Sequence, residues 1–251
     1  YAYLNREERR RAITTAAETV NKALPLIVGV GALRTSDAVT CAQDAQEAGA
    51  TALLLAPVSY TPLTQDEVYA HFCAIAAETD LPICIYNNPS TTHFRFELPL
   101  LERLAEKPNI SAVKMPLPSS GTIREDLAQL RANLPDGFSI GYSGDWGCAE
   151  ALLAGADTWY SVVGGILPQL AQSLTTAAQS GDEGLTKKVD QAFEPLWSLF
   201  QEFGSLRVVY AIAQQIGMTT AQPPRPILPL GMAANARVSS ALMDLGVSAS
   251  A

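Results

Sequence analysis

The sequence contains few of the residues that bind metals or form disulfides. Its 251 residues include two histidines, at positions 71 and 93, and four cysteines, at positions 41, 73, 84 and 148. The cysteines form no close pair, which argues against a disulfide framework and against a zinc ribbon. His71 lies in a helical stretch without a second histidine at ligand spacing, so we interpret it as a packing or surface residue. We therefore expect no metal site.

Charged residues and long hydrophobic runs are also scarce. Only 17% of the residues are charged, the net charge is −8 and no basic stripe offsets it, so we expect no nucleic-acid partner. No apolar run approaches the roughly 20 residues of a membrane span. The first residues do not resemble a signal peptide, and we expect a soluble, cytoplasmic protein. With 48% hydrophobic residues, the chain can bury the core of one α/β barrel domain.

Apolar runs alternate with segments of helical periodicity along most of the chain. Such strands, each followed by a helix, predict a parallel sheet that is covered by helices. We predict strands at 24–30, 51–57, 81–87, 110–115, 138–144 and 158–163, with helices at 5–22, 36–48, 64–79, 97–106, 121–133, 146–154 and 167–180. Only helices follow, at 183–203, 206–216 and 234–246. We accordingly divide the chain into a barrel part, 1–180, and a helical extension, 181–251.

Six strands are fewer than the eight of a closed (β/α)8 barrel. The chain begins on a helix, with Asn5 as its expected N-cap and Glu8 at the spacing of a capping box. Two explanations remain open. Either the sheet is open, or the sequence given starts inside the domain.

Two polar residues close consecutive apolar strands, Tyr86 in "LPICIYN" and Lys114 in "ISAVKM". The ends of parallel strands are where barrel enzymes place their active sites. A lysine between low-dielectric walls has a lowered pKa, and its neutral amine can form a Schiff base with a carbonyl substrate. Taken alone, the spacing favours an ordinary exposed strand-end lysine at Lys114 and an amphipathic residue that caps a core at Tyr86.

The succession "APVSYTP", "IYNNPS", "ISAVKMP" and "YSGDWG" resembles the dihydrodipicolinate synthase and N-acetylneuraminate lyase superfamily of class I aldolases. The strand-end tyrosine followed 28 residues later by the lysine is the most specific part. The resemblance implies a (β/α)8 barrel with extra C-terminal helices, a homodimer or homotetramer, and no cofactor. It also implies roles for individual residues. Lys114 would form the imine, Tyr86 would shuttle protons, Tyr60 would reach a neighbouring subunit's site, and the substrate would lie against Gly144, Asp145 and Tyr160.

The chain departs from this superfamily at two points. In the lysine-biosynthesis branch, the substrate-binding position two residues after the strand-end proline is an arginine that holds a carboxylate, whereas here it is Thr91. A threonine lacks the bidentate cationic fork of arginine. The second departure is that the loop that binds the pyruvate carboxylate would precede Tyr1. We therefore expect a family member without its first two strands, about 40 to 50 residues of a barrel.

These observations predict a Schiff-base-forming lyase that acts on pyruvate or a 2-keto acid, by aldol cleavage or by dehydration. One alternative is a non-catalytic small-molecule-binding protein on the same barrel, because a fold does not establish a function. Another is a phosphate-binding barrel enzyme, for which "SVVGGI" at 161–166 offers a weak glycine loop. Trapping of the imine by reduction distinguishes the first hypothesis from the others.

Overall fold

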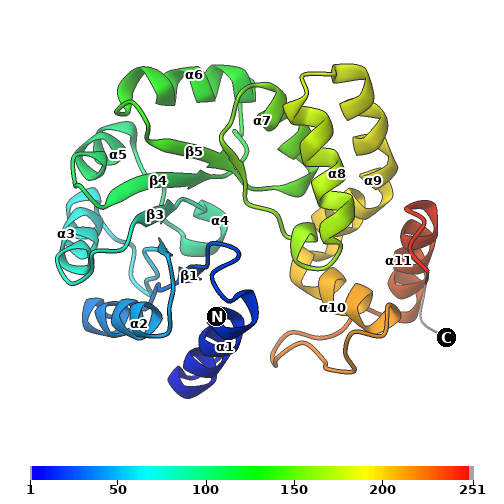
Figure 1. Ribbon diagram of the computed structural model, residues 1–251, viewed down its shortest axis with the longest axis horizontal. Coiled ribbons are helices and arrows are strands. Elements are labelled where there is room, and N and C mark those ends of the chain that lie inside the picture. The colour runs from blue at the N-terminus through cyan, green and yellow to red at the C-terminus, as the bar shows by residue number, and fades with distance from the viewer. Residues whose placement is uncertain (1, 249–251) are drawn as a thin grey trace. The chain divides into compact units, whose positions relative to one another are not determined.

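A computed structural model of the protein describes residues 2–248 as strands and helices that alternate through the first half (Figure 1). The described residues form two compact units, which divide between Tyr142 and Ser143. The strands of the first unit are β1 (Ile27–Gly29), β2 (Ala52–Leu55), β3 (Ile83–Tyr86), β4 (Ile110–Met115) and β5 (Ser139–Tyr142). Its helices are α1 (Arg6–Val20), α2 (Thr35–Glu47), α3 (Gln65–Ala76), α4 (Pro89–Thr92), α5 (Leu98–Ala105) and α6 (Ile123–Asn133).

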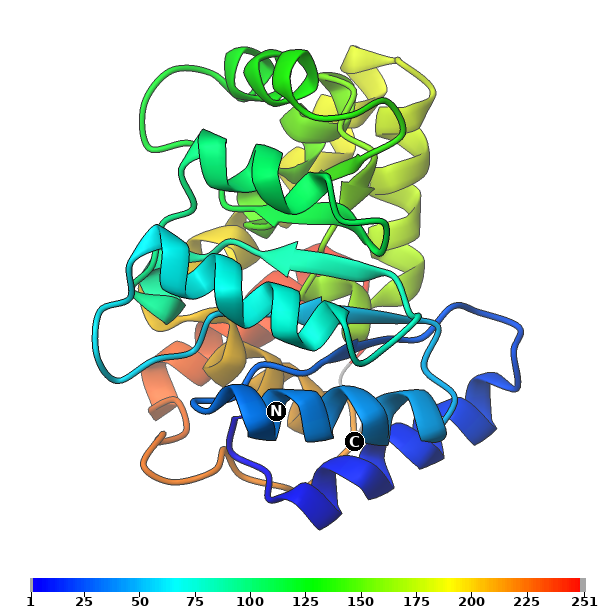
Figure 2. The ribbon, with the colours of Figure 1, turned by 90° about the vertical axis from the view of Figure 1, so that its left-hand side faces the viewer.

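The five strands of the first unit pair in parallel and in chain order. Figure 2 shows α2, α3, α5 and α6 side by side over one face of this sheet. The side chains that point towards the helices are fully buried, as Leu53, Ile85 and Val113 show at 0% exposure. Burial of each such side chain contributes about 1.5–3 kcal/mol. Neighbours such as Leu54, Ala112 and Lys114 point to the other face and stay partly exposed.

The helices begin where the sequence provides caps. The side chains of Asn5, Thr64 and Thr122 each accept a hydrogen bond from the backbone N–H three residues on. The residue at that position is a glutamate, whose carboxylate accepts a hydrogen bond from the N-cap backbone N–H, which completes a capping box. The predicted cap at Asn5 and its partner Glu8 are thereby confirmed.

The second unit contains one short strand, and otherwise helices, within its described residues. Its elements are η1 (Asp145–Gly147), α7 (Cys148–Leu153), β6 (Thr158–Trp159), η2 (Val163–Gly165), α8 (Pro168–Gln179), α9 (Glu183–Phe203), α10 (Ser205–Gln215) and α11 (Met232–Asp244). Its core centres on Trp197, whose ring stacks on Phe193 with centroids 4.7 Å apart. The indole N–H of Trp197 donates to Asp190 Oδ1 over 3.0 Å, which satisfies a buried donor.

The predicted strands and helices are confirmed, but most of the strands are shorter than predicted. The α/β class and the parallel sheet are confirmed as well, whereas the two strands expected before residue 1 stay a prediction. The boundary predicted at residue 180 stays a prediction. The compact units divide between Tyr142 and Ser143, and α7 and α8 share one buried cluster with α9, α10 and α11.

Two observations concern the cysteines and the helices of the described residues. The structure joins none of the four cysteines, at positions 41, 73, 84 and 148, in a disulfide within residues 2–248. Among residues 2–248, no helix is both long enough and apolar enough to cross a membrane.

Candidate active site

Tyr86 and Lys114 lie next to each other at the ends of β3 and β4. They are partners in the parallel register, and Lys114 Nζ lies 4.7 Å from the centre of the Tyr86 ring. On its other side, Lys114 pairs with Gly141 of β5, which adds no side chain. The Tyr86 ring therefore flanks the lysine on the β3 side, and the neighbouring position on β5 is a glycine. Both side chains are half-buried, so a small carbonyl compound can reach the amine and the phenol together.

The tyrosine hydroxyl is held by the residues that follow the strand. Asn88 Nδ2 donates to Tyr86 Oη over 3.2 Å, and Ser90 Oγ donates to Asn88 Oδ1 over 2.6 Å. The backbone N–H of Asn87 donates to the Lys114 carbonyl, 3.0 Å away, which continues the strand pairing by one residue. Because Asn88 is the donor, the phenol proton of Tyr86 stays available for another acceptor. The arrangement suits a residue that gives and takes a proton at a substrate.

This hydrogen-bonded chain contains two residues that the sequence analysis did not single out, Asn88 and Ser90. The only sequence signal was the motif "NNPS" itself. Pro89 begins the short helix α4, and this turn brings the Asn88 side chain back to the tyrosine that precedes it. The spacing of the residues in the sequence does not predict this contact between Asn88 and Tyr86.

Tyr60 and Thr91 belong to the same unit but contact neither Tyr86 nor Lys114 in any described interaction. Tyr60 is 97% exposed in the loop after β2. Thr91 is exposed on α4, and its backbone N–H donates to the Asn88 carbonyl over 3.0 Å. Neither position has a described contact that supports a role within its own chain, so the predicted roles of both residues stay predictions.

Gly144, Asp145 and Tyr160 lie in the second unit. Asp145 is 2% exposed, and its carboxylate accepts hydrogen bonds from the backbone N–H groups of Val162 and Val163 and from the Trp159 indole. The carboxylate thus anchors the loop at 160–165, and its predicted contact with a substrate hydroxyl stays a prediction. Gly144 adopts φ +100°, a conformation that favours glycine, and Tyr160 is half-buried at the start of that loop.

Two other reactive side chains have structural surroundings. His71 Nδ1 lies 2.9 Å from Thr35 Oγ1, and burial lowers the pKa of the imidazole, which fits its interpretation as a packing residue. Burial raises the pKa of the Cys148 thiol, and Asp190 and Asp145 act in the same direction. A raised pKa favours the protonated thiol, which is the less nucleophilic form.

Comparisons with known proteins give a consistent picture. The pattern of the Dihydrodipicolinate synthetase family matches residues 1–245. A 4-hydroxy-tetrahydrodipicolinate synthase of Methylococcus capsulatus is 32% identical, over 98% of this chain and 83% of its own length. A solved dihydrodipicolinate synthase from Agrobacterium tumefaciens superposes with a TM-score of 0.96 and 58% identity, covering 98% of this chain and 82% of that one. A putative dihydrodipicolinate synthetase from Pseudomonas aeruginosa has a TM-score of 0.89 and 26% identity, over 97% of this chain and 83% of that one.

Proposed function

The chain belongs to the dihydrodipicolinate synthetase family, and on that premise we propose how it acts on pyruvate. The protein is a Schiff-base-forming lyase of the class I aldolase type. Its relatives of that family carry the name 4-hydroxy-tetrahydrodipicolinate synthase. The single observation that supports our assignment of the site is the pairing of Tyr86 with Lys114 at adjacent strand ends.

The proposed reaction starts at the amine of Lys114. The nitrogen lone pair attacks the keto carbon, a C–N bond forms, and the former carbonyl oxygen leaves as water after it has taken up two protons. The resulting iminium draws electrons from the neighbouring carbon, which then loses a proton to give an enamine. The enamine carbon attacks an aldehyde to form a C–C bond, and cleavage follows the same steps in reverse. Water finally releases the product and restores the amine.

Tyr86 is the proposed proton carrier in these steps. Its ring lies 4.7 Å from the amine, measured from Nζ to the ring centroid, and the Asn88 amide stabilises the phenol oxygen whenever its proton has moved away. Lys114 and Tyr86 together therefore supply a nucleophile and a general acid-base group. A metal or an organic cofactor has no role in the proposed sequence.

The aldehyde partner is the open part of the proposal. We infer that Thr91 does not bind a carboxylate as the arginine of the lysine-biosynthesis branch does, because a hydroxyl offers neither charge nor a second donor. The acceptor is therefore expected to differ from aspartate semialdehyde. For Gly144, Asp145 and Tyr160, which lie in the second unit, the substrate contacts that the family resemblance implies stay predictions.

We also propose that the protein works as a homodimer or homotetramer. Tyr60 is 97% exposed and so is open to contact with another chain, and the family resemblance implies that this chain is a second copy of the protein. A solved relative is described as the first monomeric dihydrodipicolinate synthase variant, so the number of subunits is a property to measure for each chain.

Reduction of the imine tests the proposed function. Incubation with pyruvate and borohydride is expected to leave one reduced adduct per chain, on the peptide that contains Lys114. Lys114→Ala is expected to abolish the adduct, whereas Lys187→Ala, at an exposed lysine of α9, is expected to keep it. An adduct that survives Lys114→Ala unchanged refutes the assignment. The absence of any adduct on the wild-type chain would instead favour a non-catalytic binding protein.

A further inference from the structure

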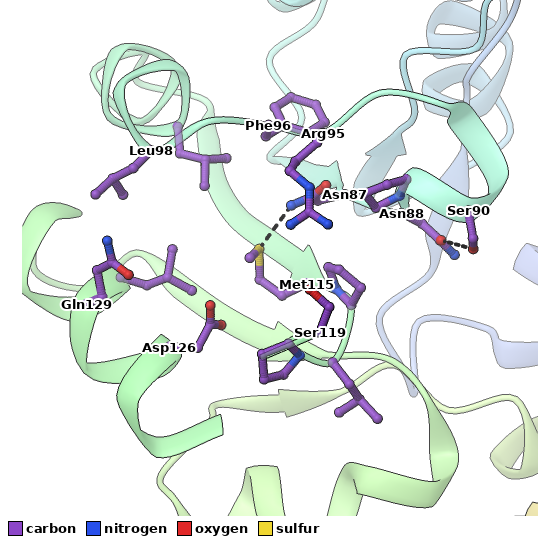
Figure 3. Close-up of a pocket in the computed structure, with 16 residues that line it drawn as sticks. Asn87, Asn88, Ser90, Arg95, Phe96, Leu98, Met115, Ser119, Asp126 and Gln129 are labelled. Atoms are coloured by element: carbon purple, nitrogen blue, oxygen red, sulfur yellow. Dashed lines mark hydrogen bonds between the residues drawn. The ribbon is translucent and has the colours of Figure 1, made fainter. Parts of the chain in front are cut away.

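The first unit contains a cavity of about 370 Å³ beside the proposed reaction site, and Asn88 and Ser90, which hold the Tyr86 hydroxyl, are among its lining residues. Its walls come from the ends of β3 and β4, from α4 and the segment before α5, and from α6. Figure 3 shows that Arg95 and Asn87 enter it from one side and Asp126 from the opposite side. Tyr86 and Lys114 are not among the residues that line it. The volume lies within the range of small-molecule sites.

Asn87 supplies a buried acceptor that lacks a donor. The residue is 3% exposed, and its Nδ2 donates to Met115 Sδ over 3.4 Å. Among residues 2–248, its Oδ1 has no hydrogen-bond partner. A buried carbonyl oxygen without a donor is unfavourable, and native structures seldom leave one unexplained. A ligand with an O–H or N–H group would satisfy it.

Arg95 supplies a positive charge at the entrance of the cavity. Within the described residues, its guanidinium takes part in no hydrogen bond and no ion pair, although its backbone carbonyl accepts a bond from Gln65. A free guanidinium binds carboxylates with two parallel hydrogen bonds. On the opposite side, Asp126 Oδ2 accepts the Tyr142 hydroxyl over 2.5 Å, which leaves Oδ1 as a second acceptor. The remaining walls include apolar side chains such as Leu98, Leu117 and Leu130.

We propose that this cavity binds a small organic acid that also carries a hydrogen-bond donor. The carboxylate pairs with Arg95, the donor reaches Asn87 Oδ1 or Asp126 Oδ1, and the carbon skeleton lies against the apolar walls. An acid without a donor leaves the buried acceptor unsatisfied. A neutral compound provides no negative charge for the Arg95 guanidinium, so its contact with that group is no stronger than a contact with water.

The cavity lies on the other face of the strands from Tyr86 and Lys114, the proposed catalytic pair, although two of its lining residues are their neighbours in the sequence. Asn87 follows Tyr86 and Met115 follows Lys114, and successive residues of a strand point to opposite faces. Tyr86 and Lys114 therefore point to the face away from the helices, while Asn87 and Met115 point to the helix-covered face and into the cavity. The proposal holds whether or not the protein forms an imine with pyruvate.

The methionines offer a direct probe of occupancy. The chain has four, and only Met115 lines the cavity, while Met218, Met232 and Met243 are exposed in the second unit. We would label the intact protein with [methyl-13C]methionine, assign the Met115 signal through Met115→Leu, and titrate with 4-hydroxybenzoate. The Met115 signal is expected to shift saturably while the other three stay in place. Benzoate, which lacks the donor, and methyl 4-hydroxybenzoate, which lacks the charge, are expected to bind more weakly.

Variants test whether the shift of the Met115 signal comes from binding in the proposed cavity. Arg95→Gln is expected to raise the dissociation constant about tenfold or more, the loss expected for a charge-assisted contact. Arg124→Gln, on the same unit but outside the cavity, and Lys114→Ala are expected to leave it unchanged. The proposal is refuted if the Met115 signal does not shift, if Arg95→Gln binds as well as the wild type, or if Lys114→Ala abolishes binding. Equal binding of benzoate would refute the requirement for a donor.

Discussion

Tyr86 and Lys114 have different roles in the proposed reaction, and the two roles separate in an experiment. The amine alone can form the imine, but the later proton transfers need the phenol. We expect Tyr86→Phe to lower turnover by about 10²-fold or more, the usual contribution of a general acid-base group. Trapping of the pyruvate adduct by borohydride should fall much less. Near-normal turnover, measured by single-substrate kinetics at saturating pyruvate, would show that another group moves the proton.

Asn88 is a positioning residue that acts through Tyr86. Its amide donates to the phenol oxygen and accepts from Ser90, so its loss removes the neutral donor that steadies the oxygen. We expect Asn88→Leu to lower kcat about tenfold, the effect of about one hydrogen bond, with little change in KM. A comparison of kcat between the double variant and Tyr86→Phe distinguishes this role from a purely structural one. On the Tyr86→Phe background, Asn88→Leu should change kcat hardly at all, because its partner oxygen is already gone.

The shared strand-end position of Tyr86 and Lys114 could be predicted because side chains on one face of a strand recur every second residue, while their catalytic roles stay predictions. That period places Tyr86 and Lys114 on one face, and the parallel pairing places them side by side. Asn88 could not be predicted in the same way, because its contact depends on the turn at Pro89 and on a side-chain rotamer. The cavity around Asn87 was missed for a similar reason. Its walls come from segments far apart in the sequence, and no local pattern marks an acceptor without a donor.

At the scale of elements, α1 is attached to α2 by charged side chains. Arg6 and Arg10 both bond to the buried Asp44 carboxylate, with N–O distances of 2.7 and 2.6 Å. The Arg6 hydrogen bond, together with the nearby positive charges, holds the pKa of Asp44 below its usual value, against the effect of burial. A group whose folded pKa is lowered stabilises the fold above its unfolded pKa, and that contribution is lost as pH falls through the folded pKa.

Asp44→Asn is therefore expected to make unfolding less dependent on pH in the acid range. Between about pH 5 and pH 3, the urea midpoint of the wild type should fall more steeply than that of the variant. The matched control is Asp66→Asn, because Asp66 is 84% exposed in its pair with Arg103 and surface pairs contribute little. Parallel curves for the wild type and Asp44→Asn would show that the pair does not stabilise the unit.

The strands and helices themselves were predictable, because apolar periodicity and caps are local properties of the sequence. Each capping box places a side chain and its backbone partner three residues apart, a distance that a reader of the sequence can check directly. The short helix α4 was missed because four residues carry no periodicity. The division of the compact units after Tyr142 has no local signal in the sequence. It depends on which helices share a core, and the buried cluster around Trp197 includes residues of α8 as well as of α9, α10 and α11.

At the scale of the whole molecule, the proposed role of Tyr60 requires a second chain, and mixed oligomers can test it. In its own chain, Tyr60 is 97% exposed and contacts neither member of the catalytic pair in any described interaction. If it completes the site of a neighbour, Tyr60→Phe and Lys114→Ala are defects in different halves of one shared site. A mixed dimer then contains one site with an intact Lys114 and a Tyr60 from the other chain. Equal mixing of the two weak variants should restore about a quarter of the wild-type sites in a dimer with two-fold symmetry.

The control is a mixture in which both defects fall within one chain's own site. Tyr86 and Lys114 are register partners in the same sheet, so mixing Tyr86→Phe with Lys114→Ala leaves every site with a defect. That mixture should gain no activity, while the Tyr60→Phe mixture should. Native mass spectrometry of differently tagged chains establishes that subunits have exchanged. If exchange is complete and neither mixture exceeds the average of its parents, Tyr60 does not act across subunits, and its exposure must serve another contact.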